Sequence, residues 1–145
     1  MKDITTPDIF LSLISFLMLS KQQIITVGAE HDLTATQSLT LIITDNNNPR
    51  PMNSLATIFG CDASNITGII DGLEQKNLIV RTESKADRRK KVIMLTEVGL
   101  AKRKEIFSEA VRKYEALFDN LDKRDVEVFT RVLAQITNEC PNKVA

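Results

Sequence analysis

Residues 52–95 read MNSLATIFGCDASNITGIIDGLEQKNLIVRTESKADRRKKVIML, and this stretch decides the fold. Its first part predicts a short helix over residues 52–59, a turn at Gly60, and a second helix over residues 63–76. Ala56 is small enough for the two helices to cross closely, and Gly60 can adopt the positive φ that turns the chain within a few residues. The stretch therefore predicts a helix-turn-helix.

The second helix carries short polar side chains on its outward face. We expect Asp62 to be the N-cap, and helical periodicity turns four residues inward: Ile66, Ile69, Ile70 and Leu73. The outward residues are Ser64, Asn65, Thr67, Gly68 and Asp71, of which the first four are candidate DNA-binding residues. Such side chains bond base edges or phosphates, and a helix N-terminus favours phosphate. In the alternative, Ser64 and Asn65 only help to cap the helix, and Thr67 is solvated surface.

Two glycines, Gly68 and Gly72, interrupt this helix. Each weakens a helix by about 1 kcal/mol relative to alanine. They can let the backbone approach DNA closely, or they can be packing compromises, and the sequence leaves both interpretations open.

A basic loop between two short strands follows the second helix. Residues 78–83 and 92–95 read as antiparallel strands, preceded by Asn77 as a left-handed C-cap, and residues 84–91 join them. Seven basic and two acidic side chains lie between residues 76 and 91, although the formal net charge of the chain is zero. The neutral total argues against a protein that coats nucleic acid, whereas a local basic face suits a selective DNA binder.

The loop is placed to act as a wing beside the recognition helix. Its candidate DNA-binding residues are Lys85, Asp87, Arg88, Arg89 and Lys90. A wing can reach the flanking minor groove, where the negative potential of A·T-rich sequence attracts an inserted arginine. An aspartate is out of place in such a loop unless it is structural, so we expect Asp87 to orient a nearby arginine through a charge-assisted hydrogen bond.

Four runs of this sequence resemble the MarR family of bacterial regulators. They are Asp62-Ala-Ser-Asn-Ile-Thr-Gly-Ile-Ile-Asp-Gly-Leu-Glu, Leu78-Ile-Val-Arg81, Asp87-Arg-Arg89 and Leu95-Thr-Glu-Val-Gly99. The resemblance implies that Arg89 enters the minor groove and that Asp87 orients it or anchors the wing. It also implies a dimeric repressor, relieved by a small aromatic or amphipathic effector, on a pseudo-palindromic operator. The sequence departs from the family pattern at Gly72, where a basic residue is common, and at Asn77, where glycine is common.

The segments outside this unit predict further helices. Residues 7–28 are apolar around most of a helix circumference, which requires cover on two sides. Thr34 and Gln37 form a capping box for a helix over residues 35–44, and Thr96 caps a long helix after the wing. A last helix, begun by a cap at Asp122, places four apolar residues on one face: Val126, Phe129, Leu133 and Ile136.

We therefore expect one domain over residues 1–145, mainly α-helical with a small β-wing (α+β). A winged helix-turn-helix lobe spans about residues 34–98, and the helices over about 7–29 and 100–138 form a dimerisation layer. In the alternative, the C-terminal helices form an α-hairpin that lies on their own domain.

Composition limits the other function classes. The chain contains a single histidine, which stands in no recognisable Ser-His-Asp pattern, and no glycine-rich phosphate loop or metal-ligand spacing is present. We expect neither an enzyme nor a cofactor. His31 is a weak candidate ligand-binding residue. Cys61, in the turn, leaves open a thiol-based redox-responsive regulator, whereas Cys140 is expected to be inert. A winged-helix interaction module without DNA binding is a further alternative.

The N-terminal apolar run, Ile9 to Leu19, is expected to be too short to span a bilayer. It lacks a basic leading region and a small-residue cleavage site, so we expect no targeting signal, no membrane partner and a cytoplasmic location. The expected partners are double-stranded DNA, a second copy of the chain and a small effector.

Overall fold

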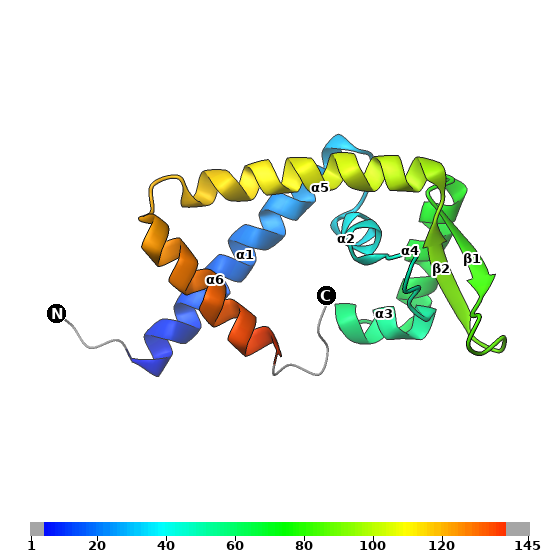
Figure 1. The fold of residues 1–145 in the computed structure, drawn as a ribbon, viewed down its shortest axis with the longest axis horizontal. Coiled ribbons are helices and arrows are strands. Elements are labelled where there is room, and N and C mark those ends of the chain that lie inside the picture. Colours follow the sequence, from blue (N-terminus) through cyan, green and yellow to red (C-terminus); the bar gives the residue numbers. More distant parts are fainter. Residues whose placement is uncertain (1–4, 139–145) are drawn as a thin grey trace.

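The computed structural model describes residues 5–138, with their elements arranged as a lobe and a layer of long helices (Figure 1). The lobe contains α2 (Ala35–Ile43), α3 (Met52–Phe59), α4 (Ala63–Gln75), β1 (Ile79–Glu83) and β2 (Lys91–Leu95). The layer contains α1 (Thr6–Glu30), α5 (Glu97–Phe118) and α6 (Lys123–Asn138). Figure 1 shows α5 running from the lobe to the far end of the molecule, where α6 turns back across α1. The predicted order of helices and strands is confirmed.

Side-chain caps fix where most of these helices begin. The predicted capping box of α2 is present: the Gln37 backbone N–H donates to Thr34 Oγ1 at 3.1 Å, and the Thr34 backbone N–H donates to Gln37 Oε1 at 3.0 Å. Thr96 accepts from the Gly99 backbone N–H at 2.9 Å, so the start of α5 is also confirmed. At the last helix, Asp122 Oδ1 accepts from the Arg124 backbone N–H at 2.8 Å, as expected of a cap.

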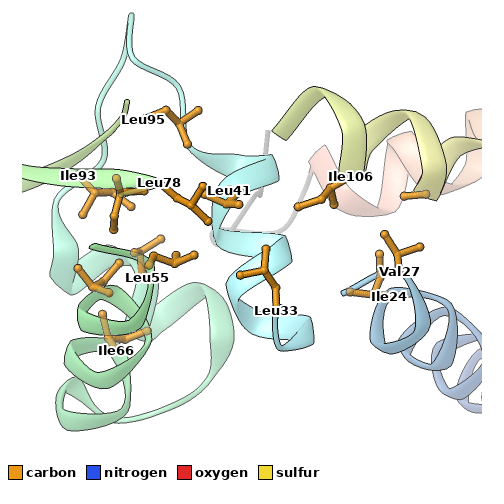
Figure 2. Packing of buried hydrophobic residues seen from close by; sticks show 14 residues of the cluster. Ile24, Val27, Leu33, Leu41, Leu55, Ile66, Leu78, Ile93, Leu95 and Ile106 are labelled. Carbon is orange, nitrogen blue, oxygen red and sulfur yellow. The ribbon is translucent and has the colours of Figure 1, made fainter. Parts of the chain in front are cut away.

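The core of the lobe lies between α2, α3, α4 and the two-stranded sheet. Figure 2 shows Leu55 and Ile66 of the helix-turn-helix facing Leu78 and Ile93 across this core. Leu41 lies toward the side of α5, where Ile106 and Val27 continue the same cluster into the layer. Each fully buried aliphatic side chain of this kind contributes about 1.5–3 kcal/mol. The lobe and the near ends of α1 and α5 are therefore one packed unit.

The sheet is an antiparallel pair in which Ile79 faces Leu95 and Glu83 faces Lys91. Residues 45–51 do more than connect α2 to α3. The Asn46 side chain donates to the Leu95 carbonyl at 2.9 Å and accepts from the Leu95 backbone N–H at 2.7 Å. Pro51 forms an isolated bridge with Val92. The segment before α3 therefore lies along β2 and holds the base of the wing.

The fully buried residues of the layer helices lie on the side of the lobe, in α1 and α5. Helix α1 buries Ile24, Val27 and Gly28, which lie near its C-terminal end, and α6 buries no residue. Nine large apolar side chains of α1 are exposed: Ile9, Phe10, Leu11, Leu13, Ile14, Leu17, Met18, Leu19 and Ile25. Phe129 of α6 forms an edge-to-face pair with Phe16 and a tilted pair with Phe118, with ring centroids 5.5 and 5.9 Å apart. The far half of the layer therefore lacks a core of its own.

The N-terminal apolar run belongs to a longer helix than the sequence indicated. Helix α1 has 25 residues, and by length and composition alone it could cross a membrane, so the expectation that this segment is too short is wrong. Its last turns, however, pack against α2 and α5, where Val27 is fully buried. Because one end of the helix is fixed in the protein core, its apolar surface favours a protein partner over a membrane span.

Candidate nucleic-acid interface

The N-terminus of α4 is organised around the carboxylate of Asp62. Its Oδ1 accepts hydrogen bonds from the Ser64 hydroxyl at 2.6 Å and from the Asn65 backbone N–H at 2.8 Å. These two hydrogen bonds, in that order of importance, lower the pKa of Asp62 below its ordinary value. The predicted N-cap is confirmed, and α4 begins with a fixed first turn.

The four candidate residues of α4 lie together on its exposed face. Ser64, Asn65, Thr67 and Gly68 are all exposed, as predicted. The Ser64 hydroxyl is engaged in the cap, and Thr67 Oγ1 donates to the Ala63 carbonyl at 3.0 Å. The Asn65 amide approaches Asp62 Oδ2 only at 3.5 Å, the longest of these contacts. The capping alternative therefore describes Ser64 well. The Asn65 side chain makes the longest hydrogen bond of the three, so it is the most available to an external partner.

The two glycines of α4 have different surroundings. A Cβ added at Gly72 would lie 2.6 Å from Nε2 of Gln37, whereas one added at Gly68 would meet no atom within 4 Å. Gly72 is therefore a packing position between α4 and α2. Gly68 lies on the open face beside Thr67, where the absence of a side chain leaves the helix backbone accessible.

The tip of the wing is held by Asp87. Its Oδ1 accepts from the Arg89 backbone N–H and from Arg89 Nε, both at 3.1 Å. Hydrogen bonding by Arg89 and the nearby positive charge of Lys90 lower the pKa of Asp87, so it stays ionised. The Arg89 side chain is nevertheless 92% exposed. The expected pairing of Asp87 with an arginine is observed, and its partner is Arg89.

The other basic residues of this region differ in whether their charge is exposed to solvent or paired with a carboxylate. Lys85, Arg88 and Lys90 are exposed on the loop between the strands. Lys91 Nζ lies 3.7 Å from Glu83 Oε1 across the strand pair. Arg81 is held by Asp71 and Glu74 of α4, so Asp71 is not simply outward-facing. Sequence reasoning counted Arg81 within the basic stretch and missed these contacts, because its partners lie ten and seven residues away.

His31 and Cys61 occupy structural positions. His31 follows α1, and its Nε2 lies 2.9 Å from Glu109 Oε2 of α5, with only 14% of the imidazole side chain exposed. Cys61 lies half-buried in the turn between α3 and α4, where it borders a shallow pocket together with Asn65 and Ile69. Within residues 5–138, no group of His, Cys, Asp and Glu side chains is arranged to hold a metal ion. Cys140 lies outside the described residues.

The arrangement of exposed α4 face, basic wing and supporting helices is matched by known proteins. The family model described as "MarR family" matches residues 33–91. Over this stretch the chain is similar to the MarR family of regulators. Among curated proteins it is similar to the HTH-type transcriptional regulator MhqR of Bacillus subtilis, with 26% identity over 107 residues that cover 74% of each chain.

Solved structures of MarR regulators show the same fold. A MarR-family transcriptional regulator from Rhodococcus sp. RHA1 superimposes with a TM-score of 0.79, 22% identity, and coverage of 93% of this chain and 96% of that one. CouR from Rhodococcus jostii RHA1, solved bound to p-coumaroyl-CoA, gives a TM-score of 0.77, 23% identity, and coverage of 93% and 95%. The predicted winged-helix fold is confirmed. The curated relatives that it matches are HTH-type transcriptional regulators, in agreement with the expectation of a regulator rather than an enzyme.

Proposed function

We propose that this protein is a cytoplasmic homodimeric repressor of the MarR type that binds a pseudo-palindromic operator. In each copy, α4 lies in the major groove and Arg89 enters the adjacent minor groove. The observation that carries the proposal is the wing tip, where an almost fully exposed arginine is braced by an ionised aspartate two residues earlier. The recognition lobe spans about residues 34–98 of a single domain, and the flanking helices join the two copies.

The exposed face of α4 suits the major groove. A helix fits this groove, and its N-terminal side chains then contact base edges. Asn65 can bond adenine through both atoms of its amide, while Ser64 and Thr67 can bond a base or a phosphate. Gly68 lets the backbone approach. We therefore assign sequence preference mainly to Asn65 and positioning to its neighbours.

The wing suits the minor groove because its arginine is already held in an exposed position. Holding a long side chain in one geometry costs conformational entropy, and the bonds from Arg89 to Asp87 reduce that cost before DNA arrives. Lys85, Arg88 and Lys90 would then neutralise phosphates on either side. Because phosphate contacts release counterions, their number sets how steeply affinity falls with salt.

A second copy of the chain is the partner that the apolar layer requires. The exposed side chains of α1 lie beside α6, which buries no residue in one copy. Contiguous exposed apolar surface of this extent is unusual in a monomer. A two-fold dimer through these helices would present two α4 helices to half-sites about one DNA turn apart.

We further propose that a small aromatic or amphipathic effector relieves repression. The support is the solved complex of CouR with p-coumaroyl-CoA, a fold neighbour. The wall proposed for the effector is formed by α1, residues 33–43 and the start of α5. His31 borders this region, but its contact with Glu109 favours a structural role for its imidazole.

Fluorescence anisotropy with a duplex selected from a random library by the wild-type protein tests the DNA contacts. Arg89→Ala should weaken binding by about tenfold and reduce the dependence of affinity on salt concentration. Arg131→Ala removes an exposed arginine from α6, far from the lobe, and should change neither quantity when light scattering shows that the variant is still a dimer. Equal behaviour of the two variants would refute the role of the wing, and failure of the wild type to bind any duplex would refute the proposal.

The same assay separates the alternatives. A regulator that responds through Cys61 would lose DNA binding after peroxide treatment and keep it in Cys61→Ser, whereas the effector mechanism predicts no difference between these proteins. An interaction module without DNA binding would give no rise in anisotropy with any duplex, at low or at high salt concentration.

A further inference from the structure

Arg81 of β1 is held against the recognition helix by three hydrogen bonds. Its Nη1 donates to Glu74 Oε2 at 2.7 Å, and its backbone N–H donates to Glu74 Oε1 at 3.2 Å. Its Nη2 donates to Asp71 Oδ1. Asp71 and Glu74 are one turn apart on α4, so a single guanidinium spans two carboxylates on the same helix face.

This cluster of Asp71, Glu74 and Arg81 lies midway along the wing. The base of the wing is fixed at buried Ile79, and the loop begins after Glu83. Arg81 pairs with Ile93 in the middle of the strand pair. Because Ile93 and Val92, which pair with Arg81 and Thr82, are themselves buried, the ion pairs add a polar connection between the middle of the wing and α4 beside the buried core.

The charges of the cluster argue against a direct contact between Arg81 and DNA. Two carboxylates on the recognition helix repel phosphates, so they weaken DNA binding unless they have another task. The Arg81 side chain is only 28% exposed, in contrast to Arg89. Its donors already point at carboxylates of its own chain, which leaves few of them for phosphate oxygens.

We propose that Arg81 is a positioning residue, which fixes the wing relative to α4 so that Arg89 reaches the minor groove while α4 occupies the major groove. The inference rests on the proposed function, because it assigns a role within the same pair of contacts, α4 in the major groove and the wing in the minor groove. It predicts that the acidic partners of Arg81, although repulsive toward DNA, strengthen specific binding.

The direction in which one substitution changes DNA affinity tests the proposal. Glu74→Ala removes a negative charge near DNA, so electrostatics alone would tighten binding. The positioning role instead predicts binding weaker by at least about fivefold. Glu83→Ala is the control, because it also removes one carboxylate near DNA, but from a wing residue that pairs with Lys91 and lies outside the cluster. It should leave affinity unchanged or raise it, and tighter binding by both variants would overturn the proposal.

Hydroxyl-radical footprints on the selected duplex show which DNA contacts each variant loses. Glu74→Ala and Arg81→Gln should lose protection where the wing contacts the flanks and keep it where α4 contacts the centre of each half-site. Arg81→Lys, which keeps the charge but cannot span both carboxylates, should recover only part of the protection. A lower melting temperature with an unchanged footprint would show a purely structural role and overturn the proposal.

A double-mutant cycle with Arg89→Ala separates positioning from direct contact. If Arg81 acts through Arg89, then Arg81→Gln should have little further effect on affinity in the Arg89→Ala background. Additive losses would show that Arg81 contributes independently and would overturn the inference. If Arg89→Ala loses affinity but Glu74→Ala does not, the proposed function stands and the positioning role fails. If the wild type binds no duplex, both fail.

Discussion

At the scale of single residues, the two glycines of α4 show what a sequence can and cannot reveal. Both are equally unfavourable in a helix, and nothing in the local sequence separates them. The structure separates them through Gln37, which lies against Gly72 but comes from α2, more than thirty residues earlier. The outward positions of Ser64, Asn65 and Thr67 were predictable, because helical periodicity alone sets them.

Gly68→Ala should stabilise the free protein and weaken its binding to DNA. The added methyl group meets no atom within 4 Å, so the variant gains helix propensity of about 1 kcal/mol, or roughly 2–4 °C in melting temperature. The same methyl group would stand between the α4 backbone and the DNA, and we expect about tenfold weaker binding. Thermal melts and anisotropy titrations measure the two effects separately.

Gly72→Ala is the matched control for this prediction. Its methyl group would displace Gln37, whose Oε1 also completes the capping box of α2. The gain in helix propensity is therefore offset, and the melting temperature should not rise, while DNA affinity should stay near that of the wild type. Unchanged DNA affinity in Gly68→Ala would mean that the backbone there does not approach the DNA.

At the scale of elements, helix boundaries were predictable where the signal is local. The caps at Thr34, Asp62 and Thr96 each act within three residues of the chain, so the starts of α2, α4 and α5 were found from sequence. The contact of Asn46 with β2 spans 49 residues and could not be found in this way. The ion pairs that join α4 to β1 were missed for the same reason.

The cap of α4 should make its stability depend on pH. Because folding lowers the pKa of Asp62 from its ordinary value of 3.8, the carboxylate stabilises the folded state above that pH. This contribution disappears as the pH falls through the lower value of the folded state. At pH 7, Asp62→Ala should lower the melting temperature by roughly 2–5 °C.

Melting curves recorded from pH 7 down to about pH 2 check this prediction. The difference between wild type and Asp62→Ala should shrink below pH 3.8. Asp62→Asn keeps a good N-cap without an ionisable group, so it should be more stable than Asp62→Ala at pH 7. A difference between wild type and Asp62→Ala that stays constant with pH would contradict an ionised cap.

At the scale of the whole molecule, a single copy leaves a large apolar surface exposed to solvent. The sequence predicted that the helix over residues 7–28 needs cover on two sides and that the last helix has one apolar face. The structure shows α1 and α6 without that cover over much of their length. The partner itself could not be derived from one chain, because apolar periodicity shows that a surface must be buried but does not show what buries it.

Leu13→Asp combined with Leu17→Asp should therefore convert a dimer into a monomer. The two residues lie one turn apart on α1 and are 48% and 60% exposed in a single copy, so the change costs little within that copy. In a dimer interface, two buried and unpaired carboxylates per chain would each oppose association strongly. Light scattering coupled to size exclusion should give the mass of two chains for the wild type and one chain for the variant. Val80→Asp, at an equally exposed apolar position on the wing, should remain a dimer. A monomeric wild type at micromolar concentration would leave the layer unpaired and remove the two-fold symmetry on which a palindromic operator depends.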